Sequence, residues 1–228
     1  MPIIIATGVS KRVSTLANPI DILKGVDLSV NPEEAIAILG ASGSGKTTLL
    51  SLLAGLDLPT QGEIILDGRA LQALSEDERA QCRLGKVGFV FQNFDLLPHL
   101  TALENVMLPL ELCRRPHAKE VAMHLLDRVE LGARAKHFPR QLSGGEQQRV
   151  AIARAFSTEP KILFADEPTG CLDTKTGETV IKLLFDLKKQ LKTTLVFVTH
   201  DQHLAQRCDR LFSLQNGKLS LLYPQSVG

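Results

Sequence analysis

The pattern of apolar and polar positions along the chain predicts strands toward both ends. Short runs of β-branched and apolar residues bounded by turn residues are typical of strands. Such runs are PIIIATGV, ILKGVDLSV, EEAIAILG, GEIILDG, KVGFVFQ, KILFA and TTLVFVTH. The Asn-Gly pair in LQNGKL predicts a tight hairpin near the end of the sequence.

Helices are predicted where apolar residues recur at intervals of three and four. Thr101 with Glu104, and Ser75 with Glu78, have the spacing of a capping box and predict helix starts. One helix is expected from about Lys46 to Ala54, and another through EQQRVAIARAF. Two further apolar stripes comprise positions 121, 122, 125, 126 and 129, and Val180, Ile181, Leu183, Leu184, Leu187 and Leu191.

Strands and helices alternate on both sides of a helical middle section, which predicts the α/β fold class with a mostly parallel core sheet. The strands near the N-terminus predict an antiparallel β layer. We expect one domain over residues 1–228. Residues 1–92 and 143–228 would form its core, and 93–142 an inserted helical sub-domain.

Composition narrows the function classes. With 228 residues and 44% hydrophobic content the chain can bury a large core. Its 26 Lys and Arg balance 25 Asp and Glu, which argues against binding nucleic acid through bulk charge. The four cysteines form no C-x-x-C pair, as expected for a reduced, cytosolic protein. No apolar stretch reaches 18 residues, so a partner chain would have to supply any membrane span.

The segment GASGSGKT at 40–47 matches G-x-x-x-x-G-K-[ST] between a predicted strand and a predicted helix. Its glycines let backbone amides point at phosphate oxygens, and Lys46 adds an ammonium. Thr47 supplies a hydroxyl for Mg²⁺. The alternative is a glycine-rich turn that merely ends a strand, but Lys-Thr at the required offset favours a nucleoside triphosphate. The motif does not distinguish among the enzymes that use one.

The apolar run ILFA leads directly into Asp166 and Glu167. A carboxylate at the end of a parallel strand faces the phosphate crevice, so Asp166 is expected to hold Mg²⁺ beside Thr47. Glu167 is expected to polarise a water molecule aimed at the γ-phosphate. The alternative for this pair is a capping or surface role. Asp173 has the position of a helix N-cap, which is compatible with a second role.

The segment QLSGGEQQRVAIARA at 141–155 places Ser-Gly-Gly at the start of a helix without a lysine. A helix N-terminus with a serine hydroxyl is a second anion site. This second site lies about 100 residues from the first and cannot easily reach the same phosphates within one protomer. The sequence therefore predicts head-to-tail pairing of two copies, each closing the other's nucleotide site.

These motifs resemble those of the ATP-binding cassette (ABC) ATPases of transporters, from about residue 3 to 222. They occur in the family's order: GASGSGKT, Gln92 in FVFQ, LSGGEQQRV, ILFADE, GCLD and His200 in FVTH. FQNFDLLPHLTALENVMLPL and FADEPTG are similar to the branch of lipoprotein-releasing (LolD-type), macrolide-export (MacB-type) and YbbA-type ATPases. FADEPTG with LFDL and RCDR is most similar to the YbbA type.

The resemblance implies a P-loop NTPase fold that hydrolyses ATP with Mg²⁺. The implied phosphate-binding residues are Gly40, Ala41, Ser42, Gly43, Ser44, Gly45, Lys46, Thr47 and Thr48. The implied metal ligands are Thr47, Gln92 and Asp166. The implied catalytic residues are Glu167, His200, Gln92 and Lys46. From the opposite protomer, Ser143, Gly144 and Gly145 would clamp the γ-phosphate, and Asp173 would cross the interface. His200 could alternatively be a strand-end histidine without a ligand.

Two positions depart from the family pattern. Val13 stands where the family usually stacks adenine on an aromatic residue, and SKRVSTLANPID contains no Phe, Tyr or Trp. An aliphatic side chain covers a base without the stacking contribution, which predicts modest base selectivity. Cys171 stands where family members often carry Asn. It is either a small residue tolerated in a turn or a thiol near the two-fold interface that oxidation could block.

The apolar segment FDLLPHL follows Gln92 and predicts a docking groove for an integral membrane permease subunit. The candidate contacts are Phe94, Leu96, Leu97 and Leu100; the alternative is that they belong to the sub-domain core. The expected protein is a homodimer that supplies energy to a membrane complex at the cytoplasmic face of the inner membrane. Its substrate would be a lipoprotein, a lipid or an exported compound. An FtsE-like mechanotransmission ATPase and a soluble ABC ATPase of translation or DNA repair are the alternatives.

Overall fold

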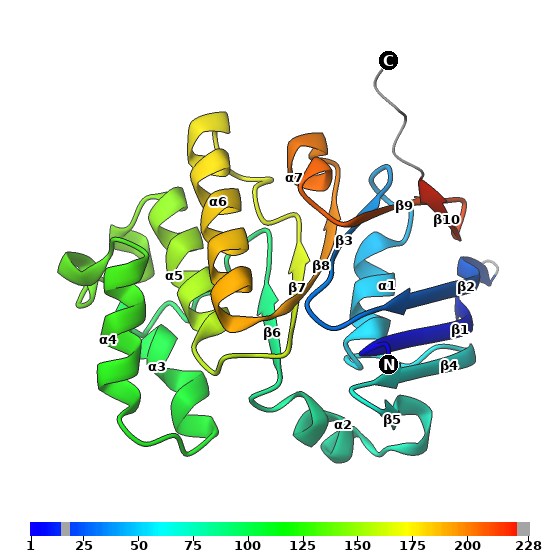
Figure 1. Ribbon diagram of the computed structural model, residues 1–228, viewed down its shortest axis with the longest axis horizontal. Coiled ribbons are helices and arrows are strands. Elements are labelled where there is room, and N and C mark those ends of the chain that lie inside the picture. Colours follow the sequence, from blue (N-terminus) through cyan, green and yellow to red (C-terminus); the bar gives the residue numbers. More distant parts are fainter. Residues whose placement is uncertain (15–18, 223–228) are drawn as a thin grey trace. The chain divides into compact units, whose positions relative to one another are not determined.

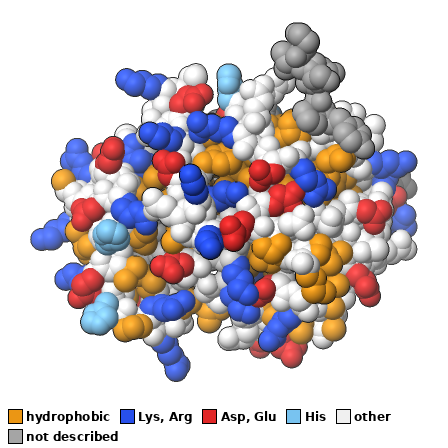
Figure 2. All heavy atoms as spheres, in the orientation of Figure 1, with side chains coloured by type: hydrophobic (Ala, Val, Ile, Leu, Met, Phe, Trp, Pro, Cys, Tyr) orange, Lys and Arg blue, Asp and Glu red, His pale blue; other side chains and the backbone are white. Residues whose placement is uncertain are grey.

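A computed structural model describes residues 1–14 and 19–222 of the chain (Figure 1). The chain forms two compact units. The first unit combines Met1–Arg83 with Thr194–Gly228, and the second unit is Leu84–Thr193. The face in Figure 2 intersperses acidic and basic side chains, with hydrophobic side chains between them.

The N-terminal part of the first unit is an antiparallel sheet in the order β2-β1-β4-β5. Its strands are β1 (Ile4–Val13), β2 (Ile20–Val30), β4 (Gln61–Leu66) and β5 (Arg69–Ala70). Alternate residues of β1 and β2, among them Ile4, Val26 and Val30, are buried, as expected for a sheet with one face on the core. This sheet confirms the predicted antiparallel β layer.

The first unit also contains parallel strands. β3 (Ala35–Leu39) lies between β8 (Thr194–Thr199) and β9 (Arg210–Gln215), parallel to both. β10 (Lys218–Leu222) is antiparallel to β9 and completes the predicted Asn-Gly hairpin. Residues buried on both faces fill β3 and β8, as in a parallel sheet covered by helices. The remaining elements are α1 (Lys46–Leu53), η1 (Leu71–Ala73), α2 (Glu76–Arg83) and α7 (Gln202–Gln206).

The second unit contains one pair of parallel strands and four α-helices among its residues. β6 (Val87–Val90) is parallel to β7 (Ile162–Asp166). The helices are α3 (Ala102–Leu112), α4 (Ala118–Arg128), α5 (Gly144–Phe156) and α6 (Thr174–Leu191), with the 3₁₀ turns η2 (Gly132–Arg134) and η3 (Pro139–Gln141). Helices α3, α4 and α5, the green to yellow-green part of Figure 1, pack around one hydrophobic cluster.

The predicted stripe on α4 needs one correction. Ala122, Leu125, Leu126 and Val129 are buried, but Val121 is 37% exposed. At 100° per residue Val121 lies at the edge of the arc that the other four residues define, so it leaves the core. The capping boxes of α2 and α3 are both formed, as predicted: the Glu78 carboxylate accepts from the Ser75 amide, and the Glu104 carboxylate from the Thr101 amide.

Candidate functional site

The loop between β3 and α1 combines an uncapped helix start with left-handed glycines. Gly45 occupies the N-cap position of α1 at φ 99°, without a side-chain cap, and Gly43 has φ 77°. A helix leaves its first amides without intrahelical partners, so they are available to an anion. A β-carbon at Gly45 would lie 3.0 Å from the Ile22 Cγ2 atom, which adds a packing reason for glycine.

Gly40 makes room inside the same loop. A β-carbon at Gly40 would lie 2.6 Å from the Ser44 Oγ atom and 2.7 Å from the Leu214 carbonyl oxygen. The Ser44 Oγ atom is itself buried without a hydrogen-bond partner. Buried hydroxyls are nearly always paired, so this orphaned group fits a ligand with acceptor oxygens, such as a phosphate.

The Lys46 side chain folds back onto the loop and binds its backbone. Its ammonium donates to the carbonyl oxygens of Gly40 at 2.8 Å and Ala41 at 3.2 Å, and the residue is only 8% exposed. The positive charge is therefore held against the loop that supplies the amides. Thr47, the next residue on α1, is exposed.

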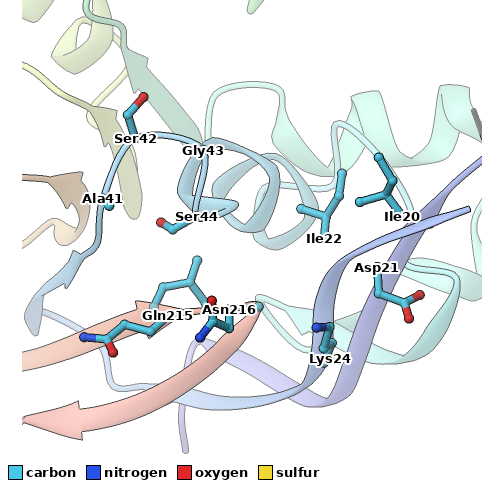
Figure 3. Close-up of a pocket in the computed structure, with 12 residues that line it drawn as sticks. Ile20, Asp21, Ile22, Lys24, Ala41, Ser42, Gly43, Ser44, Gln215 and Asn216 are labelled. Carbon is cyan, nitrogen blue, oxygen red and sulfur yellow. The ribbon is translucent and has the colours of Figure 1, made fainter.

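A pocket of about 650 Å³ adjoins this loop (Figure 3). Its walls come from three segments distant in sequence: β2, the loop and the β9–β10 hairpin. The lining residues are Ile20, Asp21, Ile22, Lys24, Ala41, Ser42, Gly43, Ser44, Leu214, Gln215, Asn216 and Gly217. Ile20 and Ile22 give β2 an aliphatic face toward the pocket, and Gln215 and Asn216 give the hairpin an amide-rich one.

The hairpin is fastened to β2. The Lys24 amide donates to the Gly217 carbonyl oxygen at 2.8 Å. A β-carbon at Gly217 would lie 2.7 Å from the Ile22 carbonyl oxygen. Asn216 and Gly217 have φ of 52° and 78°, the left-handed pair that a two-residue hairpin turn requires. The C-terminal hairpin is thus a fixed wall of the pocket.

Val13 and Ile20 are direct partners across β1 and β2, and they are 40% and 56% exposed. Directly opposed residues of an antiparallel pair point to the same face. Ile20 lines the pocket; Val13, its partner on the same face of the sheet, lies next to it and is not itself a lining residue. Residues 15–18 belong to the segment SKRVSTLANPID, which contains no aromatic residue, and lie outside the described residues.

His200 follows the end of β8 and is exposed. Thr199 of β8 is the register partner of Leu39, the last residue of β3. Because the carboxyl ends of parallel strands meet at one edge, His200 and the loop after β3 leave the sheet at the same edge.

In the second unit, Gln92 and Glu167 converge. Asp166 ends β7, Glu167 follows in the left-handed region at φ 46°, and both side chains are partly buried. A β-carbon at Gly170 would lie 3.0 Å from the Gln92 Nε2 atom and 3.4 Å from Glu167 Cβ. The missing side chain of Gly170 thus admits the Gln92 amide beside Glu167. A non-glycine residue at positive φ is a strained conformation of the kind found at functional sites.

The start of α5 is a complete capping box. The Ser143 Oγ atom accepts from the Glu146 amide at 3.3 Å, and the Glu146 carboxylate accepts from the Ser143 amide at 2.8 Å. The Ser143 amide is the main cause of a lowered pKa of Glu146, and Arg134, 3.3 Å away, lowers it further. The Ser143 hydroxyl accepts in this box, so its proton can be donated to an anion.

The N-termini of α5 and α6 are side by side. A β-carbon at Gly145 would lie 2.5 Å from the Thr176 Cγ2 atom. Asp173 is the N-cap of α6: its carboxylate accepts from the Thr176 amide at 3.1 Å, and hydrogen bonds from Thr176 lower its pKa. The buried Gln148 side chain donates to the Pro168 carbonyl oxygen at 2.6 Å and ties α5 to the turn after β7. The predicted capping role of Asp173 is confirmed.

The predicted docking residues differ in exposure. Leu97 is 43% exposed, Phe94 and Leu100 are partly buried, and Leu96 packs against the helical core. Asn105 of α3, fully buried, holds this loop: it accepts from the Leu97 amide and donates to the carbonyl oxygens of Leu97, Leu100 and Thr101.

Sequence reasoning missed Asn105, Gln148 and Arg154, three polar side chains that hold the backbone around the site. Arg154 of α5 donates to the carbonyl oxygens of Phe94 and Asp95. One sequence signal could have revealed them: each is a polar residue inside an otherwise apolar helical stretch. A polar side chain in a core must find a hydrogen-bond partner.

The residues predicted to bind Mg²⁺ come from both units and carry oxygen donors. Thr47, Asp166 and Gln92 offer hydroxyl, carboxylate and amide oxygens, which Mg²⁺ prefers. Within the described residues no three His, Cys, Asp or Glu side chains gather into a metal cluster. The described part of the chain also has no helix long and apolar enough to cross a bilayer.

Comparison with known proteins places these features in one family. The family model described as ABC transporter matches residues 23–170. The chain is 52% identical over 211 residues to YbbA, an uncharacterized ABC transporter ATP-binding protein of Escherichia coli (strain K12), covering 92% of each chain. It is 50% identical over 208 residues to the lipoprotein-releasing system ATP-binding protein LolD of Xanthomonas campestris pv. campestris (strain 8004), covering 90% of this chain and 87% of LolD.

Two solved structures of the ATP-binding cassette MJ0796 are similar to this chain in sequence and fold. The dimeric post-hydrolysis state of the ATP-binding cassette MJ0796 bound to ADP and Pi is 41% identical. It superposes with a TM-score of 0.89, covering 97% of this chain and all of that chain. A second dimeric structure of MJ0796, a bacterial ABC transporter cassette, is 42% identical with the same TM-score and coverage.

Proposed function

The chain belongs to the ABC transporter family of ATP-binding proteins, and we propose that it powers a membrane complex by closing as a homodimer on two ATP molecules and reopening after hydrolysis. The observation that carries the hydrolytic part is the meeting of Gln92 and Glu167 at Gly170, where two parallel strands end. The dimeric assembly of the MJ0796 cassette supports the homodimer.

ATP would bind through the loop in the first unit. The amides of residues 43–48, the Ser44 hydroxyl and the Lys46 ammonium would hold the β- and γ-phosphates. His200, at the same sheet edge, would contact the γ-phosphate. The base would lie against Val13 and the aliphatic face of β2.

The second unit would supply the hydrolytic groups. Glu167 would accept a proton from the water that attacks the γ-phosphorus atom, and ADP would leave with the broken phosphoanhydride oxygen. Gln92 would orient that water. Thr47, Asp166 and Gln92 would hold Mg²⁺, which neutralises charge on the phosphate oxygens when bound.

The helix start at Ser143 would act on the nucleotide of the other protomer. Ser143, Gly144 and Gly145 offer amides and a hydroxyl to the γ-phosphate of the partner-bound ATP, and Asp173 would lie at the same interface. Each protomer would then contribute half of two composite sites, which makes closure depend on ATP.

A membrane permease subunit would dock on the loop after Gln92, with Leu97 as its most exposed apolar contact and Phe94, Leu96 and Leu100 behind it. Such docking would hold the ATPase at the cytoplasmic face of the inner membrane. The 50% identity to LolD supports a lipid-linked or exported substrate.

The test is Glu167→Gln. ATP should drive this variant into a stable dimer, measured by light scattering after gel filtration, while phosphate release falls about 10²–10⁴-fold. The exposed Glu111→Gln is the matched control and should retain turnover. Turnover near that of the wild type in Glu167→Gln, or no ATP-dependent dimer, would contradict the assignment.

A further inference from the structure

Arg154 binds two consecutive backbone carbonyls of the loop that follows Gln92. Its Nη1 atom donates to the Asp95 carbonyl oxygen at 2.6 Å, and its Nη2 atom donates to the Phe94 carbonyl oxygen at 3.0 Å. The guanidinium is a planar fork of donors that suits two acceptors at once. The residue is partly buried, and this burial lowers the pKa of the group.

The backbone that Arg154 holds is in an unusual conformation. Phe94 and Asp95 have φ of 64° and 46°, two left-handed non-glycine residues in succession. L-residues with a side chain rarely adopt this region, and such residues persist where the surroundings hold them. Local bonds from the Phe94 amide to Phe91 and from the Asp95 amide to Asn93 complete the turn.

The turn places the Phe94 ring over the start of α5. A β-carbon at Gly144 would lie 3.7 Å from the Phe94 Cζ atom and 3.8 Å from the Leu172 Cδ2 atom. Gly144 and Arg154 are about 15 Å apart along the helix axis at 1.5 Å per residue. Phe94 connects the two positions: its carbonyl oxygen accepts from Arg154, and its ring lies beside Gly144.

The same loop reaches the hydrolytic groups. Gln92, two residues before Phe94, has its amide beside Gly170 and Glu167. A short segment therefore places the Gln92 side chain beside Gly170 and Glu167, and the Phe94 side chain at the first turn of α5. A displacement of the left-handed turn would move both.

We propose that Arg154 is a positioning residue: by fixing the turn at Phe94–Asp95 it seats the Phe94 ring on Gly144 and sets how Ser143–Gly145 meet the partner's nucleotide. This rests on the proposed closure of a dimer on ATP. The role is separable from ATP binding to a single protomer, since the proposed phosphate ligands there are the amides of residues 43–48, the Ser44 hydroxyl and the Lys46 ammonium. It is also separable from proton transfer, because Arg154 contacts carbonyl oxygens of the chain itself.

The experiment uses Arg154→Lys and Arg154→Met in the full chain carrying Glu167→Gln. The lysine keeps the charge but offers a point ammonium instead of a fork. Two quantities are measured: binding of a fluorescent ATP analogue to the protein below its dimerisation concentration, and the ATP concentration that gives half-maximal dimer. We expect binding within twofold of the parent and at least a tenfold higher ATP requirement for dimerisation. Arg115→Lys and Arg115→Met, at an exposed position of the same unit, are the matched controls.

Rescue distinguishes positioning from general loss of structure. Glycine adopts left-handed φ without steric cost, so Asp95→Gly added to Arg154→Lys should stabilise the turn and recover most of the lost dimerisation. Phe94→Ala, which keeps Arg154, should reproduce the defect. Unchanged dimerisation in the Arg154 variants, an equal fall in monomer binding, or no recovery by Asp95→Gly would overturn the proposal. A parent Glu167→Gln protein that fails to dimerise would instead contradict the proposed function.

Discussion

Gly145 and Thr176 bring the first turns of α5 and α6 into direct contact, because a β-carbon at Gly145 would lie 2.5 Å from the Thr176 Cγ2 atom. The glycine is therefore required by packing as well as by access of its amide to an anion. Both helix starts that belong to the proposed dimer interface are positioned by this contact.

Gly145→Ala should lower the free energy of unfolding by about 1–3 kcal/mol, the usual cost of overpacking. Urea denaturation measures it. Gly144→Ala is the matched control, because its nearest neighbours would lie at ordinary contact distances of 3.7 and 3.8 Å, and its shift should stay within about 0.5 kcal/mol. Thr176→Ser removes the opposing methyl group and should restore stability to Gly145→Ala; no restoration would refute the packing explanation.

The nucleotide base would lie against the aliphatic side chains of Val13 and Ile20, which predicts weak selectivity between adenine and guanine. GTP turnover of the wild-type protein should lie within about tenfold of ATP turnover, and Val13→Tyr should lower the KM for ATP about fivefold or more, since base–aromatic stacking contributes about 1–3 kcal/mol. Steady-state kinetics with both nucleotides measures this. Val13→Leu controls for side-chain size. A strong preference of the wild type for ATP would show that other groups recognise the base.

Asn105 should be a major determinant of stability in the second unit. Its fully buried amide satisfies four backbone groups of residues 97–101. Asn105→Ala removes the side-chain partner of the Leu97 amide and of the Leu100 carbonyl, while the carbonyls of Leu97 and Thr101 keep backbone donors, and it should cost about 2–4 kcal/mol in urea denaturation. Amide hydrogen exchange should show faster exchange at Leu97. The exposed Asn93→Ala is the control, and equal effects of both substitutions would contradict this role.

The capping box of α3 predicts a pH dependence. The Thr101 amide, which donates to the Glu104 carboxylate, lowers the pKa of that group in the folded state. A lowered pKa contributes stability above the unfolded value of about 4.3, and this contribution is lost as pH falls through the folded pKa.

Glu104→Gln does not titrate, and its amide oxygen can still accept from Thr101. Between pH 7 and pH 3.5 this variant should therefore lose less of its urea midpoint than the wild type. Glu111→Gln, at an exposed position on the same helix, controls for the loss of one carboxylate elsewhere. Parallel pH profiles of wild type and Glu104→Gln would rule out the contribution.

The sequence predicted those features that depend on local chemistry. The capping boxes at Thr101 and Ser75, the glycine loop before Lys46 and the Asn216–Gly217 turn each follow from residue types at fixed offsets. The roles of Glu167, His200 and Ser143 in hydrolysis stay predictions, as do the sub-domain limits 93 and 142.

The features that sequence reasoning missed depend on which backbone atoms meet a side chain. Arg154 and Gln148 donate to carbonyl oxygens of segments about 60 and 20 residues away. Every residue has a carbonyl group, so such a partner leaves no mark in the sequence. Val121 illustrates a different limit: a helical stripe has edges, and the residue at the edge is buried only if a neighbour extends over it.

The pocket beside the phosphate loop has one wall made by the β9–β10 hairpin at Gln215–Gly217, and the opposite wall made by residues 20–24. During translation these walls are synthesised almost 200 residues apart. A chain still on the ribosome that has not extended past Gly217 lacks both the hairpin wall and the bond from Lys24 that fastens it. Nucleotide therefore meets a complete pocket only after Gly217 has been synthesised, so ATP stabilises the completed first unit rather than guiding its early folding.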